Sequence, residues 1–220
     1  MRRPASVSPE LPLQTMLRDY WDEVASVAAA IDLACLEQAA VMLLTCQARG
    51  RVIFVVGNGG SAATASHFAC DLSKGTRCDG PPTFHVVSLT DNVPLLTAWA
   101  NDSGYDRVFS EQLMSLGRPG DLLVAISASG NSPNVVAAVD AARSCGMGVV
   151  GLSGRSGGRL ARLVDVVVNV PSDRIEIVED AHLVVAHSLC VAVRERLASG
   201  ETPLLPTTSL SVVPGRRAGR

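Results

Sequence analysis

Five short runs of apolar residues alternate along the chain with segments of helical pattern. We expect these runs to be strands, over Arg51–Gly57, Phe84–Thr90, Asp121–Ser127, Gly148–Ser153 and Asp165–Val170. They are continuously apolar, which is typical of a parallel sheet covered on both faces. Strands that alternate with helices imply right-handed crossovers. The pattern therefore predicts an α/β fold with a doubly wound five-stranded parallel sheet flanked by helices.

Helical patterns also flank this alternating region at both ends. Leu13–Arg49 has no internal proline or glycine, and it predicts two helices, a hairpin or a kinked pair, with Asp32 capping the second. A last long helix is expected from Ile175 to about Ala198. One folded domain is predicted over residues 12–199, with N-terminal helices over 12–49. Residues 1–11 and 200–220 carry proline and polar residues, so we expect them to be disordered.

The composition narrows the class of protein. A chain of 220 residues that is 47% apolar is large enough to bury a substantial core. Its net charge of −2 argues against nonspecific nucleic-acid binding. We expect no membrane partner and a cytoplasmic location, because no apolar run is long enough for a span and the N-terminus lacks a secretory signal. The six cysteines lack C-x-x-C spacing and are predicted to be mostly buried free thiols: Cys35, Cys46, Cys70, Cys78, Cys145 and Cys190.

A glycine-rich turn, Gly57–Ser61, follows the first predicted strand and opens a helix. Its backbone N–H groups and the positive end of the helix dipole suit a phosphate. It matches neither the dinucleotide-binding fingerprint nor a P-loop, and it has no lysine. His67 and Asp71 lie four residues apart on one face of the helix that follows. They indicate acid–base or metal chemistry on a phosphorylated substrate, although a lone histidine is more often structural.

Two more turns follow predicted strands at the sheet edge where ligands of open α/β sheets bind. The first, called here the serine turn, carries Ser127, Ser129 and Ser132 before Pro133. These hydroxyls at a helix start can hold a phosphate without lysine, and the alternative is simple capping by Ser132. The second turn, residues 90–92, either contributes Asp91 and Asn92 to a site or forms an Asx turn that caps the next helix.

The last predicted helix carries a further pair of candidate residues. Glu179 and His187 are eight residues apart, so they lie near one stripe of this mostly apolar helix. Because unpaired buried polar groups are costly, both need partners. His182 lies on a different side of the helix, and we expect it to face solvent or a subunit interface. His85 opens a strand and is expected to be structural.

Several motifs together resemble the sugar isomerase (SIS) domain family, and most closely its phosphoheptose isomerases. They are GNGGSA at 57–62, HF at 67–68, TDN at 90–92, AND at 100–102, ISASGNS at 126–132 and H-x-x-x-x-H-x-L-C at 182–190. The resemblance implies a five-stranded SIS fold, a helical N-terminal segment that helps to build a homotetramer, and active sites between subunits.

The resemblance also implies an activity and its residues. The activity would be aldose–ketose isomerisation of sedoheptulose 7-phosphate to D-glycero-D-manno-heptose 7-phosphate through an enediol. Zinc, one per subunit, would be bound by His67, Asp71, Glu179 and His187, and proton transfer would fall to Asp71, Glu179 and His187. The alternative is a non-catalytic SIS protein that binds phosphosugars as a regulator or binds a partner protein. The substrate-binding residues would be Asn58, Gly59, Gly60, Ser61, Asp91, Asn92, Ser127, Ser129 and Ser132.

Three positions depart from the family pattern. Asp71 stands where a glutamate is usual, Glu179 where a glutamine is usual, and Ala128 where a threonine is usual. The shorter acid can displace a proton-transfer group by roughly 1 Å, which is enough to matter for catalysis. The extra carboxylate makes the set of ligands more suitable for zinc or a hard cation. These changes are compatible with a subfamily that acts on a different phosphosugar.

Overall fold

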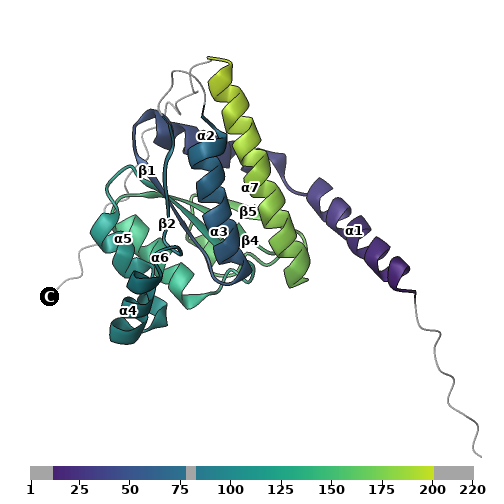
Figure 1. Ribbon diagram of the computed structural model, residues 1–220, viewed down its shortest axis with the longest axis horizontal. Helices are drawn as coiled ribbons and strands as arrows, with labels where there is room; N and C mark the ends of the chain where they lie inside the picture. The colour runs from purple at the N-terminus through teal and green to yellow at the C-terminus, as the bar shows by residue number, and fades with distance from the viewer. Residues whose placement is uncertain (1–11, 78–82, 201–220) are drawn as a thin grey trace, which may run out of the picture.

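The computed structural model describes residues 12–77 and 83–200. Within them, five parallel strands form one sheet in the order β2-β1-β3-β4-β5 (Figure 1). The strands are β1 (Val52–Val56), β2 (His85–Ser88), β3 (Leu122–Ser127), β4 (Gly148–Ser153) and β5 (Val166–Asn169). The predicted fold class is confirmed. Strand order reverses between β1 and β3, so the crevice at their carboxyl ends is the position where such folds bind ligands.

The predicted strands are correct in position and up to three residues too long. Asp121, predicted to open the third strand, precedes it, and its carboxylate accepts the backbone N–H groups of Val52 at 2.9 Å and Arg118 at 2.8 Å. Asp165 likewise precedes β5 and accepts the Val149 N–H at 2.8 Å. These two acids therefore tie neighbouring strands together at the amino edge of the sheet.

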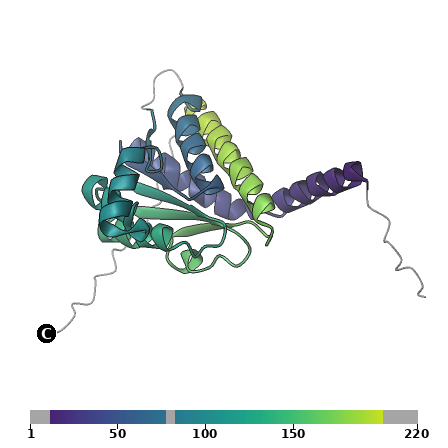
Figure 2. The same cartoon turned by 60° about the horizontal axis from the view of Figure 1, so that its bottom comes forward.

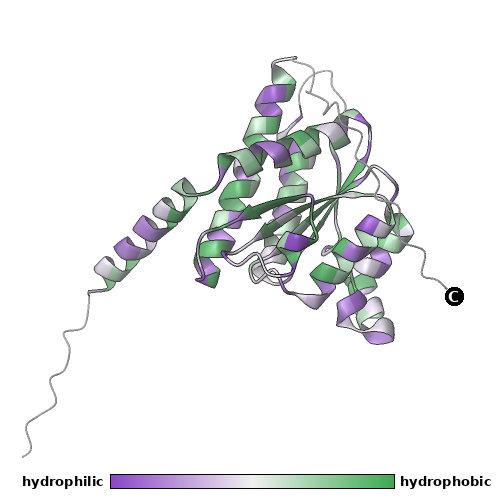
Figure 3. Ribbon diagram, turned by 180° about the vertical axis from the view of Figure 1, so that it is seen from behind, coloured by the Kyte–Doolittle hydropathy of each residue, from purple (hydrophilic) through white to green (hydrophobic). Residues whose placement is uncertain are grey.

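Helices cover both faces of the sheet. The helices α2 (Leu33–Ala48), α3 (Gly60–Cys70) and α7 (Ile175–Ala198) pack on one face, and α4 (Val93–Ser103), α5 (Ser110–Leu116) and α6 (Pro133–Ser144) lie on the other (Figure 2). Side chains of one strand alternate between the two cores, so Ile53 and Val55 face the first layer while Phe54 and Val56 face the second. The central strands are accordingly the most uniformly apolar part of the molecule (Figure 3).

Short irregular helices complete the described chain. A π-helix, Asp71–Gly75, continues directly from α3. Two 3₁₀ turns, Tyr105–Arg107 and Leu160–Arg162, follow α4 and β4. The π-helix matters for the site because it begins at Asp71, and such turns are frequent at functional sites.

The N-terminal segment forms two helices, as expected, and they are bent by 69° rather than folded into a hairpin. Asp32 caps α2 by accepting the Ala34 N–H at 2.8 Å. The first helix, α1 (Leu13–Ala29), projects from the body of the molecule, and the described chain buries none of its residues (Figure 1). No single helix of the described residues is long and apolar enough to cross a membrane, and the bent pair α1–α2 meets that length and composition only when both helices are counted together.

The cysteines of the described residues are free. Cys46 and Cys190 are buried, and burial raises the pKa of each thiol to about 12. Cys35 and Cys145 are half-buried. The expectation of burial is wrong for Cys70, which is exposed beside an open groove next to β2. Cys78 and the predicted disordered ends, apart from Gly200, lie outside the described residues.

Candidate active site

The serine turn follows β3 and begins α6. The Ser127 Oγ lies 3.0 Å from that of Ser132 and 3.5 Å from that of Ser129. Ser132 holds the N-cap position, but its hydroxyl caps no backbone N–H of the described chain. It is turned towards Ser127 instead. Simple capping therefore does not explain this serine, and three hydroxyls gather at the positive end of a 12-residue helix, where an anion is favoured.

A second loop, residues 154–160 after β4, supports the serine turn from behind. The Gly154 N–H donates to the Ala128 carbonyl and the Leu160 N–H to the Gly130 carbonyl, each at 2.9 Å. A Cβ at Gly158, where φ is +55°, would lie 2.6 Å from the carbonyl oxygens of Ser129 and Gly130. The two loops thus pack backbone against backbone. Our sequence interpretation missed this support, although the glycine pair at 157–158 was a visible signal.

A cavity of about 320 Å³ opens beside the serine turn. Ser129, Asn131, Arg155 and Asp173 are among the residues that line it, and the last two form an ion pair at 2.9 Å. The cavity offers space for the part of a ligand that extends from the turn. Arg155 was not among the predicted residues, because an isolated arginine in a loop carries no local signal of a site.

The glycine turn after β1 lies next to the serine turn. Asn58 makes side-chain hydrogen bonds that reach Asn134 in α6, and these join the two turns. Gly59, with φ +54°, precedes α3, and Ser61 is buried in the first turn of that helix. A Cβ at Gly60 would lie 2.5 Å from the carboxyl carbon of Glu179. Glycine at position 60 therefore makes room for the carboxylate that α7 brings to this turn.

A cluster of three titratable side chains forms where α3 meets α7. The Nε2 atoms of His67 and His187 lie 2.8 Å apart, and the Asp71 Oδ2 lies 3.2 Å from the first and 3.6 Å from the second. All three side chains are partly exposed in the single chain. His187, which is 120 residues away in sequence, therefore converges with His67 and Asp71 as predicted.

This cluster fits a zinc ion. Ligands that bind tetrahedral zinc at 2.0–2.1 Å lie about 3.3 Å from one another. The three separations bracket that value, and two imidazole nitrogens with one carboxylate oxygen are a donor set that zinc accepts. The same arrangement also suits proton transfer without a metal, since one histidine can donate to the other.

Glu179 is not part of the cluster in this single chain. Among the described residues, the group of side chains that could hold a metal ion comprises His67, Asp71 and His187 alone. Glu179 lies on α7 eight residues before His187, which is about 12 Å along the helix axis. Its carboxylate instead lies against Gly60. Within one chain, three of the four predicted side chains therefore meet at one point, because two turns of helix separate Glu179 from His187.

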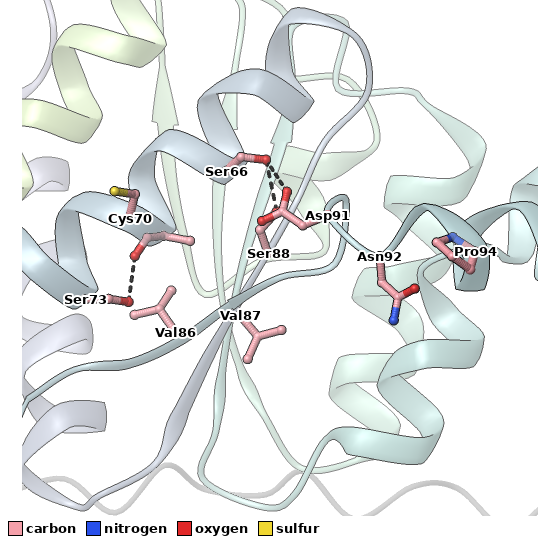
Figure 4. A pocket seen from close by; sticks show the side chains of 10 residues that line it. Ser66, Cys70, Ser73, Val86, Val87, Ser88, Asp91, Asn92 and Pro94 are labelled. Atoms are coloured by element: carbon pink, nitrogen blue, oxygen red, sulfur yellow. Dashed lines mark hydrogen bonds between the residues drawn. The ribbon is translucent and has the colours of Figure 1, made fainter.

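The turn after β2 borders an open groove of about 700 Å³ between α3, β2 and α4 (Figure 4). Asp91 accepts a short hydrogen bond from Ser66, and the Ser66 Oγ lies 3.0 Å from that of Thr90. Asn92 accepts the Leu95 N–H at 3.1 Å and so caps α4. The capping alternative is thus confirmed for Asn92, while Asp91 stays a candidate for binding. Our sequence interpretation missed Ser66.

Comparison with known proteins identifies the family. The SIS domain model matches residues 19–154. This chain belongs to the SIS domain family. It is 43% identical over 166 residues to a phosphoheptose isomerase of Rhodospirillum rubrum, covering 76% of this chain and 87% of the relative. It is 47% identical over 154 residues to one of Nitratidesulfovibrio vulgaris, covering 70% and 73%.

Solved structures agree with this assignment. A phosphoheptose isomerase structure from Neisseria gonorrhoeae superposes with a TM-score of 0.78 at 38% identity, covering 84% of this chain and 100% of that one. One from Francisella tularensis gives a TM-score of 0.77 at 30% identity, with the same coverage. The resemblance seen in the motifs is therefore confirmed over most of the described SIS domain.

His182 is placed differently from the expectation. It is 1% exposed, on the side of α7 that faces the core of the SIS domain, so the predicted solvent or interface position is wrong. Neither ring nitrogen makes a well-formed hydrogen bond with a described residue. Burial lowers the pKa of this histidine to about 4, and the Ser153 backbone opposes the shift only in part. The ring is therefore neutral at pH 7. His85 lies exposed at the start of β2.

Proposed function

We propose that this SIS protein is a phosphoheptose isomerase, which converts sedoheptulose 7-phosphate into D-glycero-D-manno-heptose 7-phosphate. The observation that carries the proposal is the cluster of His67, Asp71 and His187 in the same domain as the hydroxyl-rich serine turn. Relatives that bear the phosphoheptose isomerase name share 43% and 47% identity with this chain over most of its length. The pairing of an anion site with acid–base groups is what an isomerase of sugar phosphates requires.

In this proposal, the serine turn binds the phosphate through Ser127, Ser129, Ser132 and the backbone at the start of α6. Asn58, Gly59, Gly60 and Ser61 line the neighbouring turn, and Asp91 and Asn92 lie at the next strand end. A base takes a proton from the carbon beside the carbonyl, which leaves an enediol, and a proton returns to the neighbouring carbon. His187 serves one of these steps. Asp71 or Glu179 serves the other.

Zinc is proposed to bind at the cluster, one ion per subunit. His67, Asp71 and His187 of one chain would hold it, and a Glu179 ligand would have to come from another subunit, because Glu179 lies outside the cluster of its own chain. When bound, zinc would polarise the substrate carbonyl or order the site. Asp71 is the first residue of the π-helix. Its carboxylate, proposed for proton transfer, is on a side chain one methylene shorter than that of glutamate.

We also propose a homotetramer in the cytoplasm, with sites completed between subunits. The support is the exposed apolar stripe of α1, described below, and the half-exposed side chains of His67 and His187, since a catalytic centre needs shielding from water. Glu179 lies outside the cluster of its own chain, which also agrees with a site that is completed on assembly.

The deciding experiment is turnover of sedoheptulose 7-phosphate by the purified, zinc-replete protein. We expect isomerisation by the wild type, and none by His187→Ala, which should still bind inorganic phosphate. A Ser127→Ala/Ser132→Ala double variant should raise the Michaelis constant by at least about tenfold, because two hydroxyl contacts to the phosphate are lost. Phosphosugar binding by the wild type without turnover would instead support the non-catalytic alternative.

Metal analysis separates the two forms of the mechanism. Bound zinc near one ion per chain, lost in Asp71→Ala, supports the metal site. Full turnover by protein that contains no zinc and stays active in chelator supports proton transfer by the histidines and acids alone.

A further inference from the structure

Two asparagine side chains pair face to face across the crevice between β1 and β3. The Asn58 Nδ2 donates to the Asn134 Oδ1 at 2.8 Å, and the Asn134 Nδ2 donates back to the Asn58 Oδ1 at 2.8 Å. Asn134 is 2% exposed, and its Oδ1 also accepts the Val135 N–H at 3.0 Å. Asn134 is therefore fixed to the start of α6, and through it Asn58 is fixed there too.

A third element holds the same amide. Tyr105 opens the 3₁₀ turn after α4, directly behind Gly104 with φ +90°. Its hydroxyl donates to the Asn58 Oδ1 at 3.0 Å, although the residue as a whole is 58% exposed. The Asn58 oxygen thus accepts two hydrogen bonds, from Asn134 and from Tyr105, which fills both of its lone pairs. One hydrogen of the Asn58 Nδ2 is left for a ligand.

The hydrogen bonds among Asn58, Asn134 and Tyr105 lie between the two turns that follow β1 and β3. Asn58 immediately precedes Gly59–Ser61, and Asn134 comes two residues after Ser132, so the paired amides join the two turns assigned above to the phosphate end of the substrate. We propose that Asn134 and Tyr105 are positioning residues, which lock the Asn58 amide and so set the spacing between the glycine turn and the serine turn. This inference rests on the proposed function.

Removal of the Tyr105 hydroxyl should weaken substrate binding by a predictable amount. Tyr105 reaches the substrate site only through Asn58 in this inference, so removal of its hydroxyl should loosen the turns without removing a reacting group. The loss of one such hydrogen bond corresponds to about fivefold to tenfold in binding. Misplacement of the phosphate turn should therefore raise the Michaelis constant more than it lowers kcat.

The test is a double-mutant cycle with Tyr105→Phe, Asn58→Ala and both together. We expect Tyr105→Phe to raise the Michaelis constant for sedoheptulose 7-phosphate about fivefold to tenfold, with kcat changed less than about twofold. Asn58→Ala should have a larger effect, and the double variant should equal Asn58→Ala alone. Calorimetric titration with inorganic phosphate should show the same order of affinities. Ser144→Ala, which removes an exposed hydroxyl that donates to the Asp140 carbonyl of its own helix at 2.9 Å, is the control and should match the wild type.

Several results would overturn the inference. An effect of Tyr105→Phe that persists in full in the Asn58→Ala background would mean that Tyr105 contacts the substrate itself. Wild-type kinetics and phosphate affinity in Tyr105→Phe would mean that the bond positions nothing. Failure of the wild type to turn over the substrate would count against the proposed function, and the phosphate titrations would still decide the role of the amide network.

Discussion

The fold keeps the buried side chain of His182 neutral, and we predict that this lowers the stability of the native state at acidic pH. Burial lowers its pKa from 6.5 to about 4 in the native state. As the pH falls from 6.5 towards 4, the unfolded chain takes up a proton at this position and the native chain does not. Native stability therefore falls across that window, by up to about 3 kcal/mol, and the loss levels off below pH 4.

The measurement is urea unfolding at pH 7 and pH 4.5 for the wild type and His182→Leu. Leucine removes the titrating group while it fills the buried site, so this variant should lose about 2–3 kcal/mol less stability than the wild type between the two pH values. His85→Leu is the matched control, because His85 is exposed, and it should follow the wild type. The same acid loss in wild type and His182→Leu would contradict the prediction.

Residues of the turns that follow strands could be predicted from the local sequence. The side of a helix on which a residue lies could not, where the helix is apolar on several sides. The gathering of hydroxyls at the serine turn could be predicted, because three serines, a glycine and a proline stand between a predicted strand and a predicted helix. The wrong orientation of His182 arose because α7 is apolar around much of its circumference, so spacing separated His182 from His187 but did not show which side faces the core. Glu179 was assigned to the cluster from the family resemblance and from its stripe on the helix, and neither took account of its distance along the helix axis.

At the scale of elements, the loop after β4 is predicted to set the shape of the serine turn. In Gly158→Ala, the new Cβ would meet two carbonyl oxygens of that turn at 2.6 Å, and alanine would also be strained at φ +55°. We expect a loss of about 2–4 kcal/mol in stability and weaker phosphate affinity. Gly50→Ala is the control, because Gly50 has φ +61° with nothing within 4 Å of the added Cβ.

Thermal unfolding and phosphate titration of both glycine variants measure this contribution. Gly50→Ala should lose only about 1–2 kcal/mol, from backbone strain, and should bind phosphate normally. Equal behaviour of the two variants would show that the contact between the loops contributes nothing to the turn. The strands themselves were predictable from continuous apolar runs, whereas this contact between loops has no hydrophobic pattern and leaves only the glycine pair at 157–158 as a signal in the sequence.

At the scale of the whole molecule, α1 is an arm that exposes large apolar side chains which the described chain does not cover. Its apolar stripe is exposed, with Leu13 at 77%, Leu17 at 63% and Trp21 at 68%, and Met16 lies beside them. Polar contacts next to this stripe hold the helix to α7, through Tyr20 with Asp180 at 2.5 Å and through an ion pair between Glu23 and Arg174. An apolar stripe of this kind on a helix that the described chain leaves uncovered marks an interaction surface.

We predict that this stripe packs against a second copy of the chain in the proposed homotetramer. Leu17→Asp combined with Trp21→Asp should place two charges in that contact and shift light scattering at micromolar concentration from four copies towards one or two. Circular dichroism should stay native, because neither residue is buried by its own chain. Turnover should fall by at least about tenfold, since an interface site would lose its second subunit.

Met114→Asp is the control. It changes an exposed apolar position on α5 and should leave assembly intact. A monomeric wild type, or a double variant that still assembles fully, would contradict the prediction that the apolar stripe of α1 forms the contact between subunits.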